Sequence, residues 1–141
     1  MPEPKPAATN WWFVAAATLS LATAAIHVLA GAPEIMAPLL SSAVPVMVKG
    51  VVDVLWHHVT GLLLLAALAC FWAARHPGWR LPVLMVVGGQ FLLIALLFIV
   101  LGLNWFASLW PMPQWVLFAA MLGLMAMGAR GRNAVAQSIS P

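Results

Sequence analysis

Four long apolar runs, separated by shorter segments rich in proline or charge, are the main pattern along the chain. At a rise of about 1.5 Å per residue, a run of about 20 residues matches the ~30 Å hydrocarbon core of a bilayer. Because lipid offers no partners to backbone polar groups, each run is expected to be helical. The pattern predicts an all-α fold, a four-helix transmembrane bundle over residues 11–130, with helices at about residues 11–30, 51–74, 81–102 and 112–128.

The two ends of the chain lack this pattern. Residues 1–10 are polar and rich in proline, and residues 131–141 are polar. Such segments bury too little apolar surface to offset the entropy lost on folding, so both are predicted to be disordered tails. Asn10, directly before the first apolar run, is expected to cap the first helix.

The segment between the first two runs, residues 31–50, is apolar yet interrupted by Pro33, Pro38 and Pro45. Proline lacks a backbone donor and breaks helices, whereas a loop exposed to water would be more polar. We therefore expect an apolar interfacial loop, or a short interfacial helix, that lies in the outer leaflet over the mouth of the bundle.

The composition agrees with a membrane protein. Of the 141 residues, 65% are hydrophobic and 6% are charged, whereas soluble domains carry about 25% charged residues. The formal net charge of +3 is too small to indicate a nucleic-acid partner, so membrane lipids are the expected surroundings. The single cysteine, Cys70, excludes an internal disulfide bond.

The basic residues predict the orientation. With four helices, both tails and the loop at residues 75–80 lie on the same side of the membrane. Lys49 alone lies on the other side, and the first side collects the remaining basic residues, Lys5, Arg75, Arg80, Arg130 and Arg132. Because positively charged loops stay in the cytoplasm, we expect both termini to be cytoplasmic and the chain to lie in the cell inner membrane.

Small residues at four-residue spacing mark two candidate packing seams. The first helix carries Ala16, Ser20 and Ala24, and the fourth carries Ala119 and Gly123. Small side chains let membrane helices approach closely. These seams predict helix packing either within the chain or against another chain, which would make it part of a homo-oligomer or of a larger membrane complex.

The candidate chemistry lies toward the outer side, where ionisable residues gather. Asp53 and His57 are four residues apart, and helical neighbours at this spacing share a face. His27 lies at a similar depth on the first helix. The face of His27 continues one turn later through Gly31 toward Glu34. Because consecutive helices usually pack as antiparallel neighbours, we expect these side chains, with His58 as a substitute, to share one pocket.

Three functional interpretations of this pocket are open. Two imidazoles and a carboxylate suit a transition-metal ion, which gives the candidate ligands His27, Glu34, Asp53 and His57. A haem with two axial histidines, His27 and either His57 or His58, is a weaker fit, because it needs more room. The same groups could instead relay protons.

A structural interpretation competes with all three. Asp53 would pair with Lys49 at i, i+4, and the histidines would hydrogen-bond across helices. The chain would then be an accessory or assembly subunit of a membrane complex. No phosphate-binding glycine loop, nucleophile elbow or HExxH motif is present, so the sequence does not assign an enzyme activity.

Overall fold

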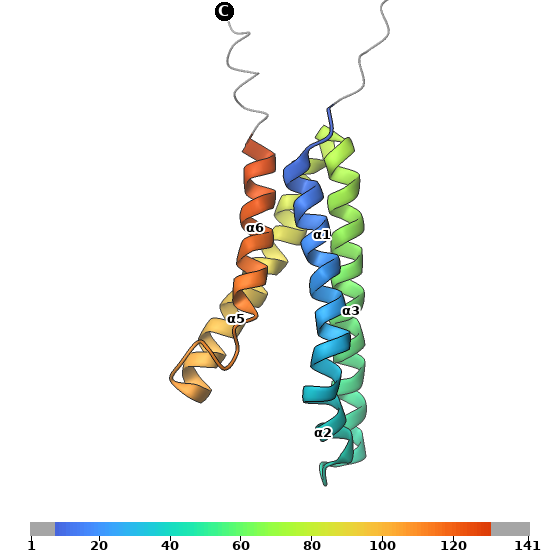
Figure 1. Cartoon of the computed structure of the whole chain (residues 1–141), viewed down its shortest axis with the longest axis vertical. Helices are drawn as coiled ribbons and strands as arrows, with labels where there is room; N and C mark the ends of the chain where they lie inside the picture. Colours follow the sequence, from blue (N-terminus) through green and yellow to red (C-terminus); the bar gives the residue numbers. More distant parts are fainter. Residues whose placement is uncertain (1–7, 131–141) are drawn as a thin grey trace, which may run out of the picture.

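The computed structural model describes residues 8–130, and over this range the chain is entirely helical apart from its turns. Figure 1 shows four helical spans running up and down, three of them long and apolar enough to cross a membrane. These spans are Trp11–Ser41, Val46–Arg75, Pro77–Phe106 and the shorter Trp115–Arg130. The predicted all-α membrane fold is confirmed. Residues 1–7 of the predicted N-terminal tail and the whole predicted C-terminal tail, 131–141, lie outside the described residues.

The first span continues past the expected end at residue 30. It consists of α1 (Trp11–Ile26), a π-helical segment η1 (His27–Met36) and α2 (Ala37–Ser41). Pro33 lies inside η1, and a proline cannot donate the i→i−4 hydrogen bond of an α-helix. The wider turns of the π-helix accommodate this proline without ending the helix. The expected helix boundary at residue 30 is therefore wrong.

The second span, α3 (Val46–Arg75), also begins earlier than expected, so residues 42–45 alone form the turn that joins the first two spans. Lys49 fastens this turn. Its Nζ donates to the carbonyl oxygens of Leu40 and Ser42, both at 2.7 Å. A cation is favoured at these carbonyls because the C-terminal end of a helix carries partial negative charge. Most of the expected interfacial loop is thus helical, and residues 42–45 form the turn of a long helical hairpin.

The third and fourth spans form a second hairpin. The third consists of a 3-10 turn η2 (Pro77–Trp79), α4 (Arg80–Val83), a π-helical turn η3 (Leu84–Gly88) and α5 (Gly89–Phe106). Ala107, with a left-handed φ of 51°, ends α5. The fourth span is α6 (Trp115–Arg130), and it packs mainly on α5 and α1.

The core of the first hairpin is built from small residues. Ala16, Ala17 and Ser20 of α1 are fully buried, and Cys70 and Ala73 of α3 are equally buried. The Ser20 hydroxyl donates to the carbonyl oxygen of Leu63 on α3 at 2.8 Å. Small side chains and an interhelical hydrogen bond are the usual means of joining helices in lipid. The predicted seam on the first helix therefore packs within the chain.

Asn10 joins three helices at the end of the bundle where both termini lie. Its side-chain oxygen accepts from the backbone N–H groups of Trp12 and Phe13, so the predicted cap is confirmed. Its amide nitrogen donates to the carbonyl oxygen of Gly128 on α6 at 2.8 Å. Its backbone N–H donates to the carbonyl oxygen of Ala74, near the end of α3, at 2.9 Å.

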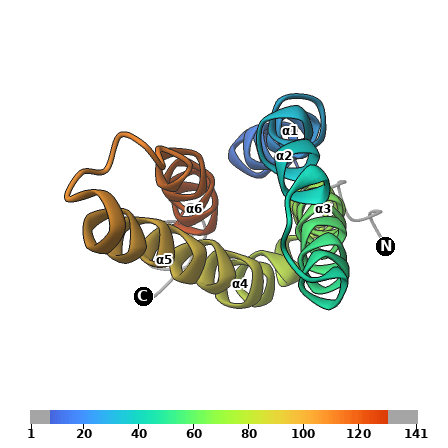
Figure 2. The ribbon, with the colours of Figure 1, turned by 90° about the horizontal axis from the view of Figure 1, so that it is seen from below.

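The two hairpins diverge toward their opposite end. Figures 1 and 2 show the hairpin of α1 and α3 separating from the hairpin of α5 and α6. The buried residues of α1 end at Ala24, and no residue from 25 to 35 is buried. Contact among all four spans is therefore confined to the end that Asn10 fastens, which we call the closed end. The other is the open end.

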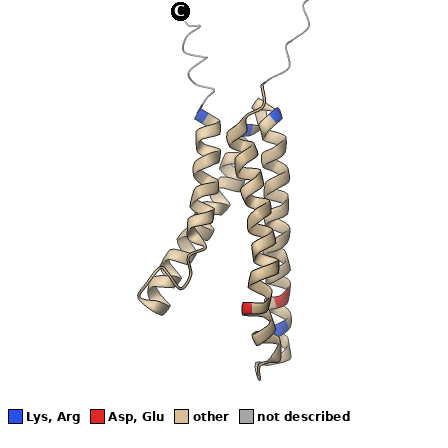
Figure 3. Cartoon of the chain, in the orientation of Figure 1, with Lys and Arg blue, Asp and Glu red and all other residues tan. Residues whose placement is uncertain are grey.

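The charged residues of the described chain lie in two groups, one toward each end of the bundle. Figure 3 shows the arginines of residues 8–130 at the closed end, and Glu34, Lys49 and Asp53 toward the open end. The membrane-crossing segments between these two groups carry no arginine, lysine, aspartate or glutamate. This arrangement leaves an uncharged band suited to lipid.

Candidate functional site

His27 lies at the start of η1 and contacts Trp56 of α3. The two rings stack with centroids 3.8 Å apart and an interplanar angle of 22°. The Nε2 atom of His27 is 3.2 Å from the carbonyl oxygen of Trp56. Because a carbonyl oxygen only accepts, Nε2 carries the proton in this hydrogen bond. His27 thus joins the two helices of the hairpin.

The ring of Trp56 also lies close to Gly31. A Cβ atom built on Gly31 would lie 2.8 Å from Cη2 of Trp56, closer than carbon atoms can pack. The ring therefore rests against His27 and, one turn later, against glycine backbone. Trp56 was not among the predicted site residues, although its position inside the second apolar run was an available signal.

Asp53 and His57 form a close carboxylate–imidazole pair on one face of α3. The Nε2 atom of His57 lies 3.5 Å from Oδ1 of Asp53, at the i, i+4 spacing expected from the sequence. Their side chains are 76% and 49% exposed for His57 and Asp53, and the neighbouring His58 is exposed as well. Lys49 contacts carbonyl oxygens, so the predicted pairing of Asp53 with Lys49 is wrong.

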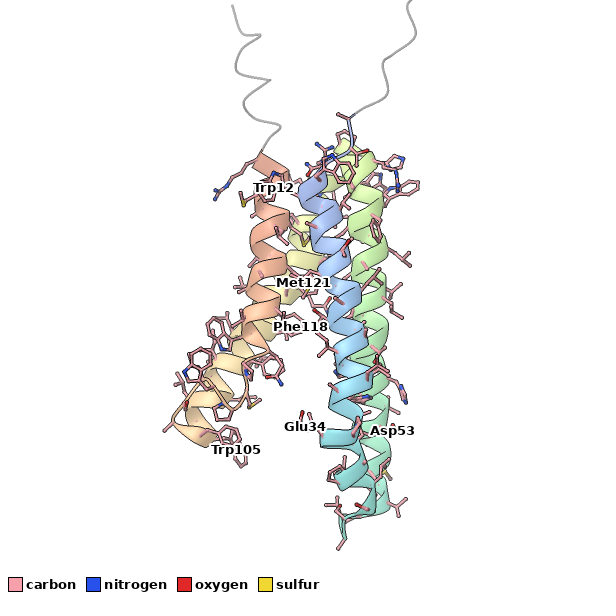
Figure 4. The ribbon with its side chains drawn as sticks, viewed as in Figure 1. Trp12, Glu34, Asp53, Trp105, Phe118 and Met121 are labelled. Atoms are coloured by element: carbon pink, nitrogen blue, oxygen red, sulfur yellow. The ribbon has the colours of Figure 1, made fainter. Side chains whose placement is uncertain are left out.

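Glu34 lies apart from the other predicted ligands. Figure 4 shows it projecting from η1 toward the side on which α5 and α6 lie, whereas Asp53 lies on α3, farther from them. The expectation that Glu34 continues the face of His27 assumed α-helical spacing. A π-helix has more residues per turn, and seven residues of it turn Glu34 away from α3.

The predicted metal centre is not supported. Within residues 8–130, no group of three or more His, Cys, Asp or Glu side chains could hold a metal ion. His27 contacts Trp56, His57 contacts Asp53, and Glu34 projects elsewhere. The predicted haem pair gains no support either, because Nε2 of His27, the expected axial ligand atom, is bound to a carbonyl oxygen.

The second predicted seam lies on the outside of the chain. Ala119, Ala120 and Gly123 of α6 are exposed, and they fall on the side of the helix opposite the buried Met121 and Met125. A Cβ atom built on Gly123 would meet nothing within 4 Å. This exposed α6 face, Ala119, Ala120 and Gly123, has the composition of a helix contact, but no helix within residues 8–130 covers it.

Comparison with known proteins gives no family. No protein-family model, no curated protein sequence and no solved structure matches this chain.

Proposed function

We propose that this chain is a small accessory subunit that supports the assembly of a larger membrane complex. The exposed α6 face is the observation that carries the proposal. Association of membrane helices depends on close backbone approach rather than on a hydrophobic driving force, so small-residue faces are where helices meet. The partner in this proposal is a transmembrane helix of another subunit.

The other seam of the chain strengthens this interpretation. Ala16 and Ser20 of α1 have the same four-residue spacing, and both are buried against neighbouring helices. Small residues at four-residue spacing are therefore buried against other helices on α1 and left exposed on α6. The proposed orientation has both termini in the cytoplasm of a cell with an inner membrane, supported by Arg75, Arg80 and Arg130 at the closed end.

Replacing Gly123 by leucine is expected to abolish the association with the partner without unfolding the chain. An added side chain at this position has open space, so it removes close approach to an external helix only. Gly89→Leu is the matched control, because Gly89 is equally exposed and open but lies at the start of α5. The measurement is the amount of a stoichiometric partner that co-purifies in mild detergent, together with the partner's level in membranes lacking the chain.

Three outcomes decide the proposal. Loss of the partner in Gly123→Leu alone, with a lower partner level in membranes that lack the chain, supports it. Equal behaviour of the two leucine variants overturns it. A homodimer that Gly123→Leu dissociates also overturns it, because the face would then serve self-association.

The second candidate function is a metal-ion or proton site at the outer leaflet. Among the predicted ligands, only the contact of Asp53 with His57 supports it. We rank it second because that pair supplies two ligands, and transition-metal sites in proteins use more. We expect purified wild type and His27→Ala to bind Zn²⁺ equally weakly in a calorimetric titration, and His57→Ala, which removes one of the two ligands, to bind it more weakly still. Tight binding that is lost in both variants would instead restore the predicted centre.

A further inference from the structure

Three charged side chains, Glu34, Lys49 and Asp53, lie toward the open end. Lys49 is held by two carbonyl oxygens at 2.7 Å, and Asp53 is paired with His57. Glu34 is exposed on η1 and makes no hydrogen bond or ion pair with any residue between 8 and 130. Among residues 8–130, Glu34 is therefore the carboxylate at this end whose side chain has no partner.

The Glu34 side chain points toward the second hairpin. It projects toward the side on which α5 and α6 lie (Figure 4), at the height where the two hairpins have diverged. Glu34 lies 22 residues beyond Trp12 on the first span, about 33 Å at a rise of about 1.5 Å per residue, slightly more than the ~30 Å thickness of the hydrocarbon core. With Trp12 at one boundary of the bilayer, the carboxylate stands at the other, outer boundary, beside helix surface that no helix of residues 8–130 covers.

We propose that Glu34 binds a lysine or arginine of a partner's transmembrane helix that lies between the outer halves of the two hairpins. An acidic side chain at this depth selects helices by charge, because an unpaired charge near lipid is costly and a paired one is not. A second copy of the chain is the less suitable occupant, since Lys49, its own cation at this end, is already bound. The inference rests on the proposed accessory role and names the chemistry of the partner.

A synthetic helix provides the test. The full chain and a leucine-rich transmembrane peptide carrying one lysine near its outer end are reconstituted in phosphatidylcholine vesicles, and association is measured by fluorescence energy transfer. The same peptide with leucine in place of lysine is the reference. We expect the lysine peptide to associate about fivefold more strongly, as for a single exposed ion pair, and the preference to weaken in high salt.

Two carboxylate variants locate the effect. Glu34→Gln is expected to remove the preference for lysine, whereas Asp53→Asn, which neutralises the carboxylate on the far side of the hairpin, is expected to keep it. Equal association of both peptides with the wild type, or an equal loss in both variants, would overturn the inference. The accessory role would survive that result, because it is tested separately through Gly123.

Discussion

Alanine at position 128 is expected to destabilise the bundle by about 1–3 kcal/mol, the usual cost of overpacking a core. An added Cβ atom would lie 2.6 Å from Cδ2 and 2.9 Å from Cε2 of Phe13, and 3.0 Å from Oδ1 of Asn10. Phe13 is fully buried, so its ring cannot turn aside. The methyl group must therefore push α6 away from α1.

Cys70 supplies the measurement. It is the single cysteine of the chain and is fully buried in the core on α3, so a thiol reagent reaches it only when the helices separate. Gly128→Ala should lower the dodecyl sulfate concentration at which Cys70 becomes labelled. Gly123→Ala, with open space at its Cβ atom, should leave that concentration unchanged.

A second substitution checks the cause. Phe13→Leu combined with Gly128→Ala should recover part of the stability, because the two sites are in contact and their effects are not additive. If Gly128→Ala alone labels at the same concentration as the wild type, the close approach of α1 and α6 is not as the structure has it.

Alanine at position 10 is expected to cost about 1–2 kcal/mol, the upper part of the range for a lost helix cap. The change removes the oxygen that accepts from the N–H groups of Trp12 and Phe13. It also removes the amide that donates to the carbonyl oxygen of Gly128. We expect earlier Cys70 labelling than in the wild type, because both α1 and its contact with α6 are weakened.

Asn10→Asp separates the two contributions. Aspartate keeps an oxygen for the cap and places a negative charge at the helix N-terminus, where it is favoured. It has no N–H to donate to Gly128, so its stability should fall between those of the wild type and Asn10→Ala. Equal stability of Asn10→Ala and wild type would show that the cap contributes nothing to the bundle.

Much of the architecture could be predicted from the sequence, because lipid imposes simple rules. Run length alone indicates four helices, and Asn10 before an apolar run indicates a cap. The small-residue spacing on α1 predicted close packing, which the burial of Ala16 and Ser20 confirms. Each of these predictions depends on neighbours in sequence or on a property of the solvent.

The predictions that failed depended on how a helix winds. Pro33 was expected to end the first helix, but a π-helical segment absorbs it. The same segment changes the direction of Glu34, so a site that needed α-helical spacing past His27 does not form. His27 was expected to face His57, yet it stacks on the adjacent Trp56, a difference of one residue that rotates the contact by about 100° around α3.

Lys49 shows a further reason why the site could not be read from the sequence. It was predicted to pair with Asp53, an acidic residue near it in the chain. The structure gives it two backbone carbonyls instead. Backbone groups at helix ends are acceptors as strong as many side chains, but a sequence does not show where a helix ends.

Because all four spans are in contact only at the closed end, the thickness of the membrane can change the distance between the two hairpins at the open end. α3 has 30 residues, about 45 Å at the α-helical rise, and a membrane helix longer than the hydrocarbon layer tilts to fit it. Because the closed end is fixed by Asn10 and Gly128, tilting must spread the two hairpins apart. A thin bilayer would hold the hairpins wide, and a thick one would bring them upright and together, so the host lipid itself would set the spacing that Glu34 faces.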